Sequence, residues 1–177
     1  MLRGTASVLA TTPAPSSVGG LKRTSLVHVP KSYDATKPVS IVLAYHGGSS
    51  NAEQMVHFCG LNDKADQAGF LVVYPNGTGR RATALTWNGG NCCGYAIQNK
   101  VDDVTFTKAL LEDLAKVVKV DPKRVYATGM SNGAVMVYRL GDAVVDHLHR
   151  NVDSRLAGEE DDPAPILLKH LRQVEPA

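Results

Sequence analysis

One stretch decides the fold of this chain: Arg124-Val125-Tyr126-Ala127-Thr128-Gly129-Met130-Ser131-Asn132-Gly133-Ala134. Residues 125–127 are β-branched, aromatic and small, as in a buried strand. Residues 131–140 predict a helix. Between strand and helix stands the pattern Gly-x-Ser-x-Gly. The sequence therefore predicts a sharp turn from a strand into a helix, with a serine at its centre.

Ser131 is the candidate nucleophile of this turn. The turn holds its central residue in a strained conformation that pushes the hydroxyl clear of the sheet. The flanking glycines keep side chains out of a crowded corner. The helix N-terminus directs N–H groups and partial positive charge at any oxyanion formed beside the serine. The alternative is a Gly/Ser turn without chemistry, but the strand before and the helix after favour the nucleophile.

A second site follows the apolar run at residues 40–45, which is typical of a central parallel strand. His46-Gly47-Gly48 stands where a serine hydrolase places the other half of its oxyanion hole, because glycine lets backbone N–H groups approach the substrate. The alternative is a Gly-rich turn capped by Ser49 or Asn51. We expect His46 to brace the loop rather than to act as the general base, since in serine hydrolases with this strand–turn–helix motif the base follows the nucleophile in the chain.

Hydrophobic periodicity predicts the remaining elements. We expect an early antiparallel strand within 21–30, in which His28 is a hydrogen-bonded strand histidine. A helical segment over 52–68 should break at Gly60, and a strand should follow over 70–75. An irregular loop over 80–91 precedes a helix that runs to residue 118, with Asp103 as its N-cap. This order predicts an α/β fold with a mostly parallel sheet and flanking helices.

Composition narrows the class of protein. The 177 residues are 44% hydrophobic and 20% charged, with a formal net charge of +2. So small a charge does not favour nucleic acid, and no apolar run could span a membrane. No clear signal peptide precedes the core. Three cysteines do not make a closed disulfide set, and the adjacent Cys92 and Cys93 are not expected to bond each other. We expect no bound metal, because no histidine or further cysteine stands at the spacing of zinc ligands. We also expect no cofactor.

Several motifs occur together in order: His46-Gly47-Gly48, residues 69–77, Trp87-Asn88-Gly89-Gly90-Asn91-Cys92-Cys93-Gly94, residues 101–104 and Gly129-Met130-Ser131-Asn132-Gly133. Over about residues 19–140 the chain resembles the polyhydroxybutyrate depolymerase and feruloyl esterase group of α/β-hydrolases. The resemblance implies a largely secreted carboxylesterase that acts on small-molecule or polymeric esters. It places the nucleophile on Ser131 and the oxyanion donors on the backbone N–H groups of Asn132 and of Gly48 or its neighbour. It also implies that Trp87 walls the substrate pocket.

The chain departs from that family after residue 140. We divide it into a linker-like lead (1–20), an α/β-hydrolase core (21–140) and a divergent tail (141–177). Family members continue with three strands that carry the catalytic acid and histidine, so the sheet is expected to be incomplete on its C-terminal side. Many of them also have a cysteine, a partner for one of the paired cysteines, where this chain has Gly141-Asp142.

The tail offers few candidates for the rest of a catalytic triad. A continuous helix would carry the acidic and histidine residues just after Leu140 too far from the serine to act on it: Asp142, Asp146, His147 and His149. Asp161 or Asp162, with His170, keeps the order serine, acid, histidine and is the remaining candidate pair. Glu159-Glu160-Asp161-Asp162 is otherwise a solvated acidic run.

The sequence thus predicts a serine carboxylesterase that hydrolyses feruloyl, hydroxyalkanoate or other short acyl esters through an acyl-enzyme on Ser131. The alternative is a catalytically impaired hydrolase fragment that acts only as a binding or assembly unit. The strand at 125–128 should have a neighbour on each side. An open edge there predicts either cover by residues 166–171 or a homodimer, which sedimentation at micromolar concentration tests.

Overall fold

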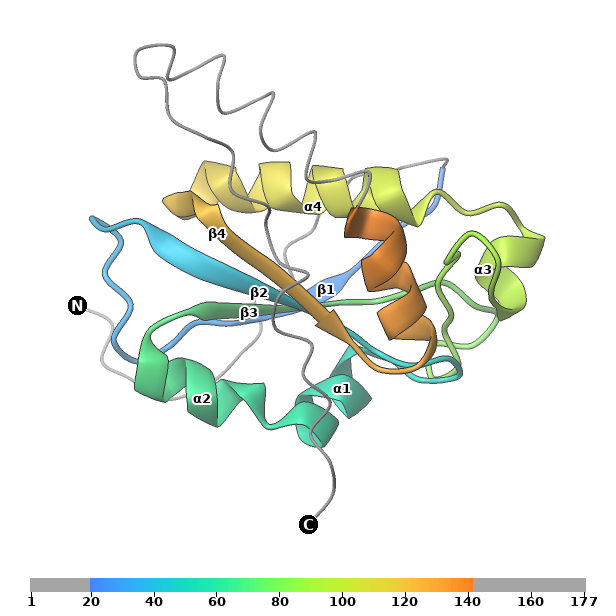
Figure 1. Ribbon diagram of the computed structural model, residues 1–177, viewed down its shortest axis with the longest axis horizontal. Coiled ribbons are helices and arrows are strands. Elements are labelled where there is room, and N and C mark those ends of the chain that lie inside the picture. The colour runs from blue at the N-terminus through green and yellow to red at the C-terminus, as the bar shows by residue number, and fades with distance from the viewer. Residues whose placement is uncertain (1–19, 142–177) are drawn as a thin grey trace.

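The computed structural model describes residues 20–141, in which one sheet lies between two layers of helices (Figure 1). The sheet has the strand order β1-β3-β2-β4. Its strands are β1 (Ser25–His28), β2 (Val39–Tyr45), β3 (Leu71–Pro75) and β4 (Val120–Gly129). β1 is antiparallel to β3, whereas β3, β2 and β4 run parallel. This confirms the predicted antiparallel lead strand and parallel core.

Two short helices cover one face of the sheet (Figure 1). They are α1 (Ala52–Cys59) and α2 (Leu61–Ala68). The Asn51 side chain caps α1 by accepting a hydrogen bond from the Gln54 N–H at 2.9 Å. Gly60 separates the two helices in a left-handed conformation, φ 60°, which confirms the predicted break, since a side chain would strain this backbone.

The opposite face is covered by α4 (Asp103–Val117) and by a helix over residues 132–141, drawn in orange in Figure 1. These helices bury a larger core against the sheet. Its largest fully buried members are Trp87, Tyr45, Phe106, Ile41, Leu71, Leu110 and Met136. The sequence missed α3 (Gly94–Gln98), a single short helix after the loop at 80–91, because five residues are too few for a hydrophobic period.

The N-terminus of α4 corrects one prediction. Asp102, not Asp103, is the N-cap, and its side chain accepts hydrogen bonds from the N–H and the hydroxyl of Thr105 at 2.9 and 2.7 Å. Asp103 is the first helical residue, and its exposed fraction is 0%. Local sequence could not separate the two adjacent aspartates, because burial decided between them.

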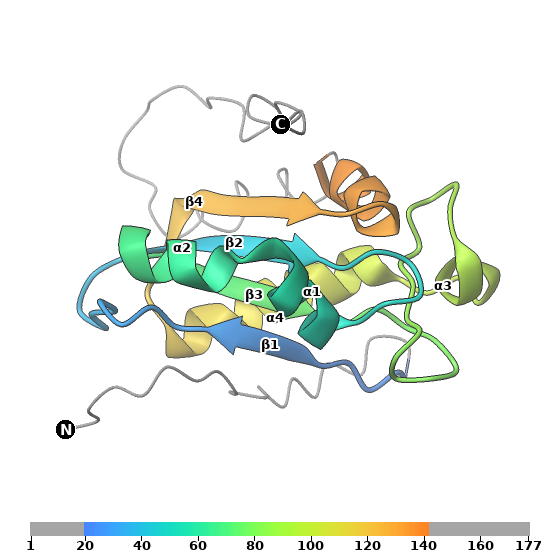
Figure 2. The same ribbon diagram turned by 90° about the horizontal axis from the view of Figure 1, so that it is seen from below.

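β4 is longer than the sequence suggested and lies at an edge of the described sheet. It pairs with β2 from Ile41 opposite Val125 to Tyr45 opposite Gly129. Within residues 20–141 it has no second strand neighbour, although a strand of this kind is expected to have one on each side; the sheet of the described residues is open on the side where the sequence predicted it to be incomplete. Figure 2 shows β4 beyond β2, with β1 at the other edge. Pro122 is tolerated here because it lies in an edge strand, beside a register shift.

None of the helices among residues 20–141 is long and apolar enough to cross a membrane.

Candidate active site

The stretch that joins β4 to the following helix forms the predicted sharp turn. Ser131 has a φ of 51° although it is not glycine, and its side chain is exposed. A serine in the left-handed region costs about 1–3 kcal/mol, which the surrounding structure must supply. The Met130 N–H donates to the Tyr45 carbonyl at 3.2 Å, and the Gly133 N–H donates to the Met130 carbonyl at 2.8 Å. The turn is thereby held against the end of β2.

The two glycines of the motif are required by close backbone contacts. A Cβ on Gly129 would lie 2.5 Å from the Gly133 carbonyl carbon. A Cβ on Gly133 would lie 2.5 Å from the His46 carbonyl oxygen, and it would also collide with the Tyr45 carbonyl. Both obstacles are backbone atoms, which cannot rotate away as a side chain can. The glycines therefore let strand, helix and the end of β2 meet at one point.

We expect Gly133→Ala to lower the free energy of unfolding by about 1–3 kcal/mol, because the added methyl group forces apart packed backbone segments. Gly141→Ala is the matched control, since it adds the same methyl group to the same helix where nothing lies within 4 Å. Urea unfolding of both variants measures the effect. Equal stability of the two variants would contradict this account of the turn.

The loop that follows β2 lies directly against Ser131 and Asn132. A Cβ on Gly47 would be 3.8 Å from the Ser131 Cβ, and one on Gly48 would be 3.5 Å from the Asn132 Cβ. The hydrogen bonds of the turn leave the N–H groups of Gly48 and Asn132 without a partner among the described residues. Two unpaired donors beside an exposed serine are the arrangement that an oxyanion hole requires.

His46 braces this loop, as predicted. Its ring is completely buried, its Nε2 accepts a hydrogen bond from the Gly77 N–H at 3.0 Å, and its Nδ1 lies 2.7 Å from the Gly47 carbonyl. This pattern fits the neutral tautomer with the proton on Nδ1. Burial lowers the pKa of His46, and the neighbouring Arg23 charge lowers it further, while the bond to Gly47 opposes the shift. The ring therefore cannot serve Ser131 as a base.

This burial predicts a loss of stability in mild acid. The unfolded chain takes up a proton at His46 near its ordinary pKa of 6.5, whereas the folded ring resists protonation. Stability is therefore fully present above pH 6.5 and falls as pH drops toward the lower folded pKa, by at most about 1.4 kcal/mol per pH unit. We expect His46→Gln to remove this part of the slope in urea unfolding between pH 7 and 5. An unchanged slope in the variant would contradict the assignment.

Trp87 does not wall an open pocket. Its side chain has an exposed fraction of 0%, and its indole N–H donates to the His46 carbonyl at 2.9 Å. Its ring meets Tyr45 edge-on at 5.0 Å and lies 4.9 Å from the His46 ring. The prediction of a pocket wall was wrong because the sequence showed that the tryptophan stood in an irregular loop, but not that the loop folds under the active-site turn.

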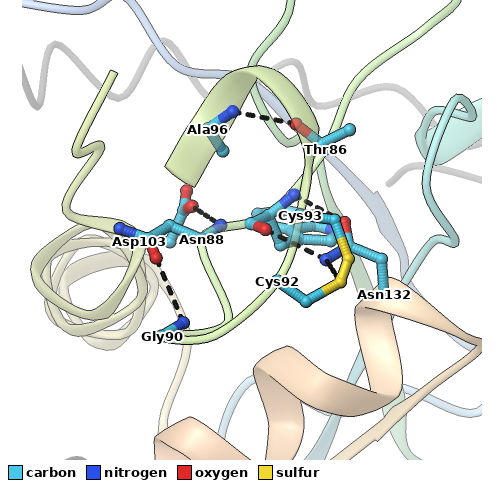
Figure 3. The surroundings of a disulfide bond; sticks show 9 residues. Thr86, Asn88, Gly90, Cys92, Cys93, Ala96, Asp103 and Asn132 are labelled. Carbon is cyan, nitrogen blue, oxygen red and sulfur yellow. Dashed lines mark hydrogen bonds between the residues drawn. A yellow bond between two sulfur atoms is a disulfide. The ribbon is translucent and has the colours of Figure 1, made fainter. Parts of the chain in front are cut away.

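The cysteines also differ from expectation. Cys92 and Cys93 are joined to each other in the structure (Figure 3), whereas the sequence predicted no bond between them. The Asn132 side chain lies 3.9 Å from the Cys92 sulfur. Cys59 is a free thiol next to the Tyr74 hydroxyl, also at 3.9 Å.

A general base for Ser131 is not found among residues 20–141. The only histidine whose contacts lie at the turn is His46, which is committed to the loop. His28 pairs with Asp66 at 3.0 Å instead, which confirms its predicted structural role. The candidates Asp162 and His170, and the alternatives Asp161, Asp142, Asp146, His147 and His149, lie outside the described residues. No group of three histidine, cysteine or acidic residues within the described part could hold a metal ion.

Sequence reasoning missed a buried ion pair beside the site. Arg23 and Asp103 lie 2.6 Å apart, and both side chains are almost completely buried. The second Asp103 oxygen accepts from the Asn88 N–H at 2.7 Å, and the Arg23 guanidinium lies over the Phe106 ring at 3.8 Å. Arg139 of the helix after Ser131 donates to the Asn88 carbonyl at 2.6 Å. The ion pair thus joins the residues just before β1 to α4 and, through Asn88, to the Trp87 loop. Asn88 in turn joins this group to the helix that follows Ser131.

A mostly parallel sheet with helices on both faces, and with a strained serine at the carboxyl end of a strand, defines an α/β-hydrolase fold. Residues 26–146 match the esterase PHB depolymerase family, and the chain belongs to that family.

Curated relatives agree with this family. NocK from Nocardia uniformis subsp. tsuyamanensis, named as a candidate esterase, is 35% identical over 104 residues, which are 59% of this chain and 28% of NocK. Feruloyl esterase B of Piromyces equi is 29% identical over 124 residues, 70% of this chain and 22% of that protein. The chain therefore spans about a quarter of the length of these relatives.

A solved structure shows the same fold. The acetyl xylan esterase from Aspergillus awamori superposes with a TM-score of 0.61 at 16% identity, over 81% of this chain and 48% of that chain. At this identity the likeness shows the fold alone.

Proposed function

We propose that this chain carries the nucleophile and the oxyanion hole of a serine carboxylesterase. The observation that supports the proposal most directly is the geometry of Ser131. It is exposed, strained at φ 51°, and adjacent to the loop of Gly47 and Gly48. A structural turn would have no need for a strained serine at this position, whereas a nucleophile must stand clear of the sheet.

The reaction would proceed in two halves. The Ser131 oxygen attacks the ester carbonyl carbon while a general base takes the hydroxyl proton, and the carbonyl oxygen becomes an oxyanion. The N–H groups of Gly48 and Asn132 donate to that oxyanion. The intermediate expels the alcohol, which leaves with a proton, and forms an acyl-enzyme. Water then attacks the acyl group and releases the acid and the free serine.

The base and acid are proposed from chain order alone. His170 follows Asp162, which follows Ser131, as the order of this fold requires. The substrate class is proposed from relatives named feruloyl esterase, so that feruloyl or other short acyl esters are the first candidates. Secretion is proposed on the same resemblance, and a homodimer through the free edge of β4 remains a proposal.

A two-part experiment tests the function. The purified protein is incubated with p-nitrophenyl butyrate to measure hydrolysis, and with an organophosphonate probe to label an activated serine. We expect turnover, and we expect mass spectrometry to find the label on Ser131. A folded protein that neither hydrolyses the ester nor takes up the label would favour the alternative, a binding or assembly unit.

A further inference from the structure

Trp87 contacts the segments that carry both halves of the proposed oxyanion hole. Its backbone N–H donates to the Asn132 side-chain oxygen at 2.7 Å, and its carbonyl accepts from the Asn132 amide nitrogen at 3.0 Å. Its indole N–H donates to the His46 carbonyl at 2.9 Å. Figure 3 shows Asn132 reaching from its helix toward the loop that carries these groups. One residue therefore holds the segment after the nucleophile and the segment before Gly47.

The Asn132 side chain is fixed by this contact. It is 4% exposed, and its carbonyl and its amide both bond to one residue 45 positions away. An amide bound through both of its ends cannot rotate without breaking a buried hydrogen bond. The backbone N–H that Asn132 offers to the oxyanion belongs to the same residue, so its position is fixed as well.

Contacts outside the active-site turn also set the position of Trp87. The next residue, Asn88, donates its backbone N–H to Asp103 at 2.7 Å and its side-chain amide to the Val101 carbonyl at 2.9 Å. The Trp87 ring packs against Tyr45 of β2. Trp87 is thus anchored to two rigid elements, α4 and the sheet, in addition to its contacts with the His46 loop and the turn at Ser131.

We propose that Trp87 is a positioning residue that sets the spacing between the Gly48 and Asn132 N–H donors, with the Asn132 side chain as its second arm. The proposal rests on the function proposed above. Stabilisation of an oxyanion depends on donors held in place before the reaction, and small displacements reduce it steeply. Substrate binding before attack depends on these donors much less.

Trp87→Phe tests the proposal, because it removes the indole N–H and retains an aromatic ring. We expect kcat for p-nitrophenyl butyrate to fall about 10- to 100-fold, with KM changed by less than about threefold. Tyr74→Phe is the matched control. Tyr74 is also completely buried and donates one side-chain hydrogen bond, to Asn62 at 2.7 Å, but it packs on the face of the sheet covered by α1 and α2. Its kcat should stay within about twofold of wild type.

A second readout does not depend on activity. The backbone amide signals of Gly48 and Asn132 are followed by NMR, and their hydrogen exchange is measured in both variants. We expect the Gly48 amide, which follows the segment that loses the indole hydrogen bond, to shift or exchange at least about tenfold faster in Trp87→Phe, with the Val72 and Val73 amides unchanged. The Asn132 amide should change less, because the backbone groups of Trp87 still hold its side chain. An unchanged Gly48 amide in Trp87→Phe would overturn the proposal even in an inactive protein. If the Gly48 amide changes in Trp87→Phe while the wild-type protein shows no turnover, the proposal is retained and the proposed function is rejected instead.

Discussion

Ser131→Ala is expected to reduce kcat for ester hydrolysis by about 10⁴- to 10⁶-fold, because loss of the nucleophile removes the acyl-enzyme route. The oxyanion donors remain, so a small residual rate above the uncatalysed reaction should persist. KM should change little, since the hydroxyl acts mainly in the transition state. Initial rates with p-nitrophenyl butyrate, measured over a wide range of enzyme concentration, give the comparison.

Two further variants make this result specific. Ser50→Ala removes a hydroxyl that donates to Gln54 at 2.8 Å, away from the turn, and should retain full activity. Ser131→Gly should be as inactive as Ser131→Ala. Its free energy of unfolding should nevertheless be about 1 kcal/mol higher than that of Ser131→Ala, because glycine adopts a φ of 51° without strain. Wild-type activity in Ser131→Ala would exclude this serine as the nucleophile.

Asp103→Ala is expected to lower the free energy of unfolding by about 3–5 kcal/mol, because it leaves the buried Arg23 charge without its partner. Burial raises the pKa of the Asp103 carboxyl and lowers the pKa of the Arg23 guanidinium, since removal from water disfavours both charged forms. Mutual attraction offsets part of that cost. A loss of this size is a large fraction of a typical total stability of about 5–15 kcal/mol.

The double variant Arg23→Met with Asp103→Leu separates pairing from packing. If the loss arises from an unpaired charge, this variant should be more stable than Asp103→Ala, because it buries no charge. Lys116→Ala is the surface control. Its ammonium lies 2.6 Å from Asp113 but is largely exposed, so its removal should cost far less than the removal of Asp103. Equal losses in Asp103→Ala and Lys116→Ala would refute the assignment.

The sequence by itself determined the features that depend on residues close together in the chain. Alternation and apolar runs located the four strands, and Gly60 located the break between α1 and α2. Gly-x-Ser-x-Gly located the turn with a strained serine, because the two glycines and the serine that the turn requires lie within five positions. The apolar run at residues 40–45 showed that His46-Gly47-Gly48 forms a loop at the end of a buried strand. These signals are local, so a single chain reveals them.

Only the tertiary structure decided which polar residues are buried and what they contact. Arg23 and Asp103 are 80 positions apart, and Trp87 and Asn132 are 45 apart. No local pattern marks such pairs. The sequence therefore indicated Asp103 as an N-cap and Trp87 as a pocket wall. Folding buries both side chains between segments that are distant in the sequence, where water is excluded. A polar group there must find a partner within the protein, and the packing of distant elements determines which partner it finds.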